Sequence, residues 1–264
     1  MSAYNVRLYD YKHSQQLRIY TKAVNQQSED DKKADVKNND KKEKEEQEQT
    51  EPDYERSYKV STNRTKQKIY EITRANTWDW FITLTFDRNK IDSSNYDLLL
   101  EKVRKWFNHV KERKAPNMKY IIIPELHKDG IHYHFHGLLA DCSQLTFVDS
   151  GIVQNGKIVY NISDFRYGFT TATKVEDTRK VSSYISKYIT KDLEIHIKGK
   201  RRFLASKNCE KVNIIDYHMT EEEIETLMDS ISLDITHMKT QDIPDAHQRI
   251  KYIELKKGDI GNDR

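Results

Sequence analysis

The sequence has few cysteines, few apolar residues and no long hydrophobic run. Its two cysteines, Cys142 and Cys209, exclude a disulfide-rich scaffold and an all-cysteine zinc site, and they fit a reducing, intracellular setting. No apolar stretch approaches the roughly 20 residues of a membrane-spanning helix. Charged residues throughout the first 20 positions exclude a secretory signal. Only 36% of the 264 residues are hydrophobic, so we expect the core to be smaller than the chain.

One segment, residues 29–51, is densely charged and contains no aromatic residue. Ten acidic and six basic residues occupy its 23 positions. This composition leaves too little apolar surface to offset the entropy of ordering, and it predicts a disordered linker over residues 26–53. Because residues 29–51 carry a net charge of −4 and the whole chain +3, the other 241 residues carry +7. A basic body is weak support for a polyanionic partner.

The order of apolar patterns predicts an α+β protein with a central antiparallel sheet and flanking helices. Alternating residues predict an N-terminal β-hairpin within residues 1–25, and a folded domain is expected over residues 54–215. Residues 216–264 are expected to be a tail with one short helix, which Thr220 and Glu223 would cap. Within the domain we predict the following strands: 80–86, 119–125, 131–139, 157–162 and 165–169. Helices are predicted at residues 92–114, capped by Asp92 or a following serine, and 177–192.

Residues 132–136 (His-Tyr-His-Phe-His) form the sharpest local motif. Side chains alternate on a strand, so three imidazoles are expected on one face and two aromatic rings on the other. A short turn joins this strand to the preceding one, so Glu125 can lie beside the histidines. Two imidazoles and a carboxylate suit a divalent ion with open coordination positions, and His127 is a competing third ligand. The alternative is a set of exposed strand histidines with no ligand role.

The helix predicted at residues 177–192 carries two phenols and two ammonium groups on one face. At about 100° per residue, one arc holds Tyr184, Lys187, Tyr188 and Lys191. A lysine beside a phenol favours the phenolate and can bind a phosphate oxygen. The alternative is amphipathic packing with half-buried tyrosines and extended lysines. With the histidine strand in the same domain, we favour a tyrosine nucleophile that cleaves a single-stranded phosphodiester beside a metal ion.

Three motifs, in this order, resemble those of the HUH endonucleases, specifically the rolling-circle replication initiators of small phages and bacterial plasmids. They are residues 81–86 (Phe-Ile-Thr-Leu-Thr-Phe), 134–136 (His-Phe-His) and 184–191 (Tyr-x-x-Lys-Tyr-x-x-Lys), and the resemblance covers about residues 57–211. It implies an RRM-like or ferredoxin-like core. It also implies metal-dependent, sequence-specific nicking and rejoining of single-stranded origin DNA through a 5′-phosphotyrosine intermediate.

The resemblance assigns metal-binding roles to three residues. His134 and His136 match the two histidines that bind the ion, and Glu125 matches a glutamate on the preceding strand that completes the site. The implied cofactor is a divalent metal, Mg²⁺ or Mn²⁺. His132 is an additional histidine to which the resemblance gives no role.

The resemblance also assigns catalytic roles on the tyrosine helix. Tyr188 matches the nucleophile and Lys191 the lysine that assists it. Tyr184, followed by Lys187, matches the second tyrosine of the two-tyrosine initiators. In that scheme one phenol holds the old strand end while the other cuts the new one.

Further segments are candidates for DNA contact. A basic segment can grip the DNA backbone, or be an ordinary solvated loop: Lys198, Lys200, Arg201 and Arg202. Three residues before the tyrosine helix can stack on bases, or pack in the core: Arg166, Tyr167 and Phe169. The sequence contains no Walker A motif, helix-turn-helix or zinc finger, so no fused helicase is expected. The expected partners are single-stranded origin DNA and a host helicase and DNA polymerase, in the cytoplasm of a bacterial host.

Two other functions compete with the initiator. The first is a relaxase or single-strand transposase, which would use the same chemistry. Relaxases usually carry the tyrosine near the N-terminus, and the paired tyrosines favour an initiator over a one-tyrosine transposase. The second is a non-enzymatic DNA-binding regulator with a structural metal site. That regulator would keep its function after Tyr188→Phe, whereas an initiator would lose its covalent adduct.

Overall fold

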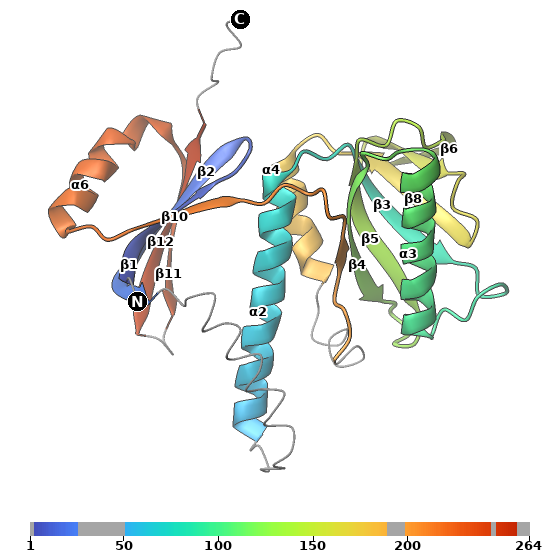
Figure 1. Ribbon diagram of the computed structural model, residues 1–264, viewed down its shortest axis with the longest axis horizontal. Helices are drawn as coiled ribbons and strands as arrows, with labels where there is room; N and C mark the ends of the chain where they lie inside the picture. The colour runs from blue at the N-terminus through green and yellow to red at the C-terminus, as the bar shows by residue number, and fades with distance from the viewer. Residues whose placement is uncertain (1–2, 26–50, 189–198, 244–246, 258–264) are drawn as a thin grey trace, which may run out of the picture. The chain divides into compact units, whose positions relative to one another are not determined.

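The computed structural model describes residues 3–25, 51–188, 199–243 and 247–257, and the side chains of residues 51–57 are not among those described. The chain divides into two units, each with its own antiparallel sheet (Figure 1). Unit 1 combines Met1–Tyr54 with Val212–Arg264, and unit 2 is Glu55–Lys211. The prediction of an α+β fold with antiparallel sheets and flanking helices is confirmed.

Unit 2 is built on a seven-stranded sheet in the order β6-β7-β8-β3-β5-β4-β9. Its strands are β3 (Trp80–Phe86), β4 (Lys119–Leu126), β5 (Tyr133–Ala140), β6 (Phe147–Gln154), β7 (Lys157–Ile162), β8 (Gly168–Lys174) and β9 (Leu204–Ala205). The predicted strands at β3, β4, β5 and β7 are confirmed. The strand predicted at residues 165–169 instead begins at Gly168 and continues to Lys174, and β6 was not predicted.

The alternation of β3 gives the sheet two different faces. Ile82, Leu84 and Phe86 are buried on the face covered by helix α3 (Tyr96–Arg113), and the ring of Tyr96 packs against the aromatic residues of β5. Thr83 and Thr85 point to the opposite face. Helix α4 (Thr178–Ile185) lies over part of that second face, as the aromatic contacts below establish.

Both predicted helices of unit 2 begin or end at different residues from those expected. Helix α3 is capped by Asn95, whose side chain accepts the backbone N–H of Leu98. Asp92, the predicted cap, instead accepts hydrogen bonds from Ser94. Helix α4 is capped by Asp177 and gives way to the short 3₁₀ helix η1 (Ser186–Tyr188). Residues 189–192 of the predicted helix lie outside the described residues.

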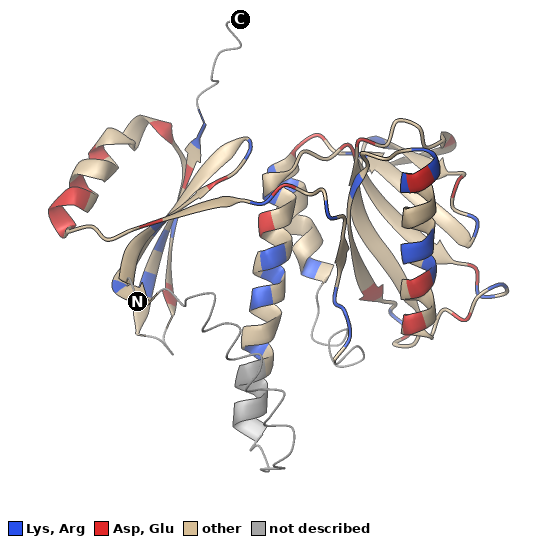
Figure 2. Ribbon diagram, in the orientation of Figure 1, with Lys and Arg blue, Asp and Glu red and all other residues tan. Residues whose placement is uncertain are grey.

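A long helix, α2 (Glu51–Ala75), precedes β3 and was not predicted. It begins inside the segment expected to be a disordered linker, and residues 26–50 of that segment lie outside the described residues. The described part is rich in Lys, Arg and Gln, which are good helix formers, and buried Ile69 anchors it to the core of unit 2. Blue bands along α2 in Figure 2 mark this basic character.

Unit 1 joins segments from both ends of the chain in one five-stranded sheet. Its order is β10 (Asn213–Tyr217), β1 (Ala3–Asp10), β2 (Ser14–Asn25), β12 (Gln248–Lys256) and β11 (Ile235–Ile243). The predicted hairpin is present as β1 and β2. Residues 216–264, expected to be a tail, instead supply most of the other three strands. Most side chains of β11 are exposed, so this strand carries little apolar signal, and β12 pairs with β2 far away in the sequence.

Helix α6 (Glu221–Ser230) supplies apolar side chains to the small core of unit 1. The predicted capping box is confirmed, because Thr220 and Glu223 exchange both hydrogen bonds. The helix is followed by the 3₁₀ helix η2 (Ser232–Asp234). Its apolar side chains pack with four buried strand residues: Val6, Leu17, Ile253 and Leu255. Within the described residues, no helix is both long and apolar enough to cross a membrane.

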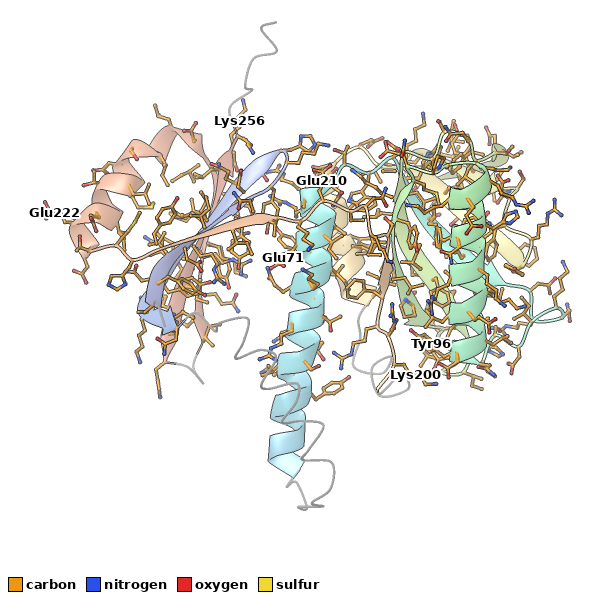
Figure 3. The ribbon with its side chains drawn as sticks, in the orientation of Figure 1. Glu71, Tyr96, Lys200, Glu210, Glu222 and Lys256 are labelled. Atoms are coloured by element: carbon orange, nitrogen blue, oxygen red, sulfur yellow. The ribbon has the colours of Figure 1, made fainter. Side chains whose placement is uncertain are left out.

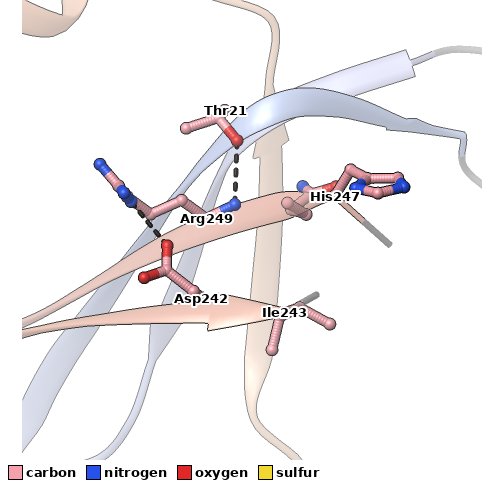
Figure 4. A pocket seen from close by; sticks show the side chains of 6 residues that line it. Thr21, Asp242, Ile243, His247 and Arg249 are labelled. Atoms are coloured by element: carbon pink, nitrogen blue, oxygen red, sulfur yellow. Dashed lines mark hydrogen bonds and ion pairs between the residues drawn. The ribbon is translucent and has the colours of Figure 1, made fainter. Parts of the chain in front are cut away.

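A small pocket lies where β2, β11 and β12 meet (Figure 4). Its polar groups largely bind one another. The side chain of Arg249 pairs with Asp242 at 2.7 Å, and the backbone N–H of Arg249 donates to Thr21 Oγ1 at 3.0 Å. The pocket wall therefore consists of groups that are already partnered.

Gly137 allows β4 and β5 to approach closely. A Cβ atom at this position would lie 2.6 Å from the backbone oxygen of Ile121 and would also collide with the side chain of Ile122. We expect Gly137→Ala to lower the free energy of unfolding by about 1–3 kcal/mol, measured by urea denaturation. Thr85→Ala, an exposed site on the adjoining strand, should change it by less than about 0.5 kcal/mol. Equal stability of the two variants would contradict this account of the crowding.

Candidate metal centre and tyrosine pair

Three side chains converge on the face of the sheet that carries Thr83 and Thr85. Glu125 on β4 lies directly opposite His134 on β5, and His136 follows two residues later on the same face. Glu125 Oε2 is 2.5 Å from His134 Nε2 and 2.6 Å from His136 Nε2, and the two Nε2 atoms are 2.9 Å apart. The strand register therefore places the three predicted metal ligands together.

The donor set fits a divalent cation. Ligand atoms at right angles around an ion, each about 2.1 Å from it, are about 3 Å apart, which is close to the spacing in this cluster. The three atoms come from two imidazoles and one carboxylate, and all lie within 4.8 Å of one another. His136 is buried, whereas Glu125 and His134 are partly exposed, so the cluster is open on one side. This arrangement is compatible with a divalent metal that keeps open positions.

The surroundings keep Glu125 and His136 in the states that bind a cation. Burial by itself raises the pKa of Glu125, but hydrogen bonds with His134 and His136 lower it to about 2, so the carboxylate is ionised at neutral pH. Burial lowers the pKa of His136, which favours the neutral imidazole. A hydrogen bond of 3.1 Å joins His136 Nδ1 to Thr83 Oγ1. With Nδ1–H donating to Thr83, the Nε2 lone pair is directed at the cluster.

Thr83 therefore orients a metal ligand from the neighbouring strand. We expect Thr83→Val, which keeps the shape of the side chain and removes the acceptor, to weaken Mn²⁺ binding about tenfold. Isothermal titration calorimetry measures this affinity directly. Thr85→Val, one row away and without a contact to His136, is the matched control and should bind Mn²⁺ like the wild type. An unchanged affinity in Thr83→Val would remove the positioning role.

The other two histidines near this strand do not join the cluster. His132 precedes β5, and its Nδ1 lies 2.8 Å from Asp129 Oδ2 in the turn. The expectation that three histidines share one strand face is therefore wrong, because the strand begins at Tyr133. His127 also faces Asp129, with its Nδ1 at 3.5 Å from the carboxylate. The geometry favours Glu125 over His127 as the third ligand.

The two tyrosines of the predicted helix lie beside the cluster. The ring of Tyr188 stacks on that of His136, with centroids 3.8 Å apart and planes 14° from parallel. The hydroxyl of Tyr188 donates to the hydroxyl of Tyr184 at 2.9 Å. Phe81 on β3 lies against both tyrosines and His136, so it forms the floor of the site. Tyr188 is half-buried against the ligands, whereas the side chain of Tyr184 is exposed.

The phenol of Tyr188 is strongly held in its protonated form. Burial raises its pKa, and the hydrogen bond to Tyr184 and the negative charge of Glu125 raise it further. The ammonium of Lys187 lies 6.0 Å from the ring centroid of Tyr184 and does not reach Tyr188. Lys191, the predicted assisting lysine, lies outside the described residues.

The basic segment predicted to contact DNA is attached to helices α2 and α3. Lys200 pairs with Asp97 at 2.7 Å and lies 5.7 Å from the ring centroid of Tyr96, next to which it is seen in Figure 3. Tyr96 donates its hydroxyl to the backbone oxygen of Arg201, whose side chain is exposed. Arg202 donates to hydroxyl groups of α2: Ser61 and Thr65. Lys198 lies outside the described residues.

Comparison with known proteins gives one match. Residues 79–193, just under half of the chain, match a family model described as replication-associated protein of the ORF2 type. No curated protein and no solved structure matches the chain. The matched residues include the whole cluster of Glu125, His134 and His136 and both tyrosines. The family match supports a DNA-binding protein with a role as a replication initiator.

Proposed function

We propose that this protein is a rolling-circle replication initiator of the HUH type, which nicks and rejoins single-stranded origin DNA through a phosphotyrosine link. One observation carries the proposal: the stacking of Tyr188 on His136, within a cluster whose other members are His134 and Glu125. A regulator with a structural metal site would have no need of a tyrosine held against a ligand. The family match supports the same direction.

The three clustered residues would hold a divalent ion, Mg²⁺ or Mn²⁺. When bound, this ion would polarise the scissile phosphate and offset its negative charge. The role of the protein is to hold Glu125 as a carboxylate and His136 as a neutral imidazole, as the pKa shifts favour. Thr83 keeps the ring of His136 in its orientation through the bond to Nδ1.

Tyr188 is the first nucleophile in this proposal. Its phenolic oxygen attacks phosphorus, a P–O bond to tyrosine forms, and the bond from phosphorus to the 3′ oxygen breaks. The phenol loses its proton, and the departing 3′ oxygen gains one to become a free 3′-hydroxyl. The hydrogen bond from Tyr188 directs the phenolic proton at Tyr184. The number of phosphoester bonds is conserved, so a later hydroxyl can reverse the step and rejoin the strand.

Tyr184 is the second nucleophile. Its hydroxyl is 2.9 Å from that of Tyr188, so either oxygen can approach a phosphate bound at the same place. With one phenol esterified to the old strand end, the other remains available for the new strand. Lys187 and Lys191 would assist by stabilising negative charge. The exposed Arg201, with Lys198, Lys200 and Arg202, would bind the DNA backbone.

The test is incubation of the protein with labelled single-stranded origin DNA and Mn²⁺ or Mg²⁺, followed by a denaturing gel. The proposal expects a shortened labelled strand and a slower band that protease converts to a faster one, because the protein is covalently attached. The reaction should stop when EDTA is added. Hydrolytic products without the protease-sensitive band would contradict the phosphotyrosine link. Specific binding without cleavage would favour the regulator.

A further inference from the structure

The face of the sheet that carries the metal cluster is not fully covered by α4. Three side chains on this face of β3 and β8 are exposed: Thr85, Phe169 and Thr171. Phe169 is 70% exposed, and among the described residues no aromatic ring packs against it. Of the three residues singled out before the tyrosine helix, Tyr167 instead contacts Phe165, a member of the buried core, and Arg166 is exposed.

Phe169 stands in one row with the metal ligands. On β8 it pairs with Thr85 of β3, Thr85 pairs with His134 of β5, and His134 pairs with Glu125 of β4. Partners in such a row point to the same face of the sheet. Two strand spacings, about 10 Å, separate the backbone of Phe169 from that of His134. The small Thr85 between them leaves the surface open from the cluster to the phenylalanine ring.

The position of Phe169 is fixed by its neighbour. A Cβ atom on Gly168 would lie 2.5 Å from the backbone nitrogen of Asp87 and would collide with the backbone of Thr85 and Phe86. The missing side chain therefore lets β8 lie tightly against the end of β3. An apolar ring held on a rigid strand, open to solvent and beside a phosphate site, is the arrangement that stacks on an unpaired base.

We infer that Phe169 is a base-stacking platform for the single strand whose phosphate occupies the metal cluster. This inference rests on the proposed function for the identity of the strand. The ring binds a nucleobase next to the scissile phosphate, and Thr85 and Thr171 provide the flat, small surface beside it. Stacking is tolerant of sequence, because every base has an aromatic face. Phe169 therefore holds the strand in place while other contacts read the origin.

The test measures binding without cleavage. The full chain, in EDTA, is titrated into fluorescein-labelled oligo(dT) and into an abasic strand of the same length and charge. We expect Phe169→Ala to weaken oligo(dT) binding about tenfold and to leave the abasic strand unaffected. Phe169→Trp should restore the affinity for oligo(dT), and Phe169→Leu, which is apolar but has no ring, should not. Val153→Ala, an exposed apolar site on β6 of the same sheet, is the matched control.

The outcomes separate this inference from the proposed function. A wild-type protein that forms no covalent adduct, combined with a selective loss of oligo(dT) binding in Phe169→Ala, would overturn the nickase and leave the stacking platform in place. Equal affinity of Phe169→Ala and the wild type for oligo(dT) would overturn the platform. Equal losses on the oligo(dT) and abasic strands would also overturn it, because a stacking contact requires a base.

Discussion

Replacing His136 with alanine is expected to reduce metal-dependent nicking at least about a hundredfold. The change removes one of three clustered ligands, and it also removes the ring on which Tyr188 stacks. His134→Ala removes a ligand without that second effect, so it should lose Mn²⁺ binding while Tyr188 keeps its support. Gel cleavage assays and calorimetric Mn²⁺ titrations measure the two losses separately. Comparable cutting by His136→Ala under saturating Mn²⁺ would contradict the assignment.

The chain offers a matched control for the histidine changes. His132 lies just before the same strand, but its imidazole binds Asp129 in the turn. His132→Ala should therefore keep both Mn²⁺ affinity and cleavage. Glu125→Ala should weaken ion binding by a smaller factor than either ligand histidine, because water can occupy the vacated position. If His127→Ala were more damaging than Glu125→Ala, the third ligand would be His127.

Replacing Tyr188 with phenylalanine is expected to remove most of the initial covalent adduct. Phenylalanine keeps the stacking on His136 and the contact with Phe81, so only the nucleophilic oxygen is lost. Tyr184→Phe should still cut once, because Tyr188 is intact, but it should fail to complete strand transfer. Thermal unfolding of both variants should resemble the wild type, which makes the pair a matched comparison.

Mass spectrometry of the trapped peptide decides between the two tyrosines. An adduct found mainly on Tyr184 would reverse their roles, and equal adducts on both would make them interchangeable. No adduct on either would leave only hydrolytic nicking and contradict the covalent mechanism. Lys191→Ala should slow the first cut without abolishing it, because the lysine assists with charge and forms no bond to phosphorus.

The cluster could be predicted from the sequence because its geometry is local. A two-residue period places His134 and His136 on one face, and a short turn brings Glu125 into register with them. The turn itself was harder to predict. His132 keeps the same alternation in the sequence, yet Asp129 binds its imidazole and backbone N–H and holds it in the turn.

The parts that were missed depend on contacts between distant residues or on weak patterns. Helix α2 lies next to a densely charged segment, and it is anchored to its core by few apolar residues, such as Ile69. Strands β11 and β12 are rich in polar residues, so their period-two pattern is faint. Their place in the sheet follows from pairing with β2, near the other end of the chain. Such pairing leaves no signal within a short window of sequence.

The interleaved sheet of unit 1 sets an order in which the chain can fold during synthesis. The β1–β2 hairpin is made first, but its neighbours β10 and β12 are made after all of unit 2. At about 5–20 residues per second, the hairpin waits on the order of ten seconds or more for both partners. Unit 2 can complete its own sheet in that interval. Meanwhile, both edges of the nascent hairpin stay unpaired, where a second nascent chain or a chaperone can bind them.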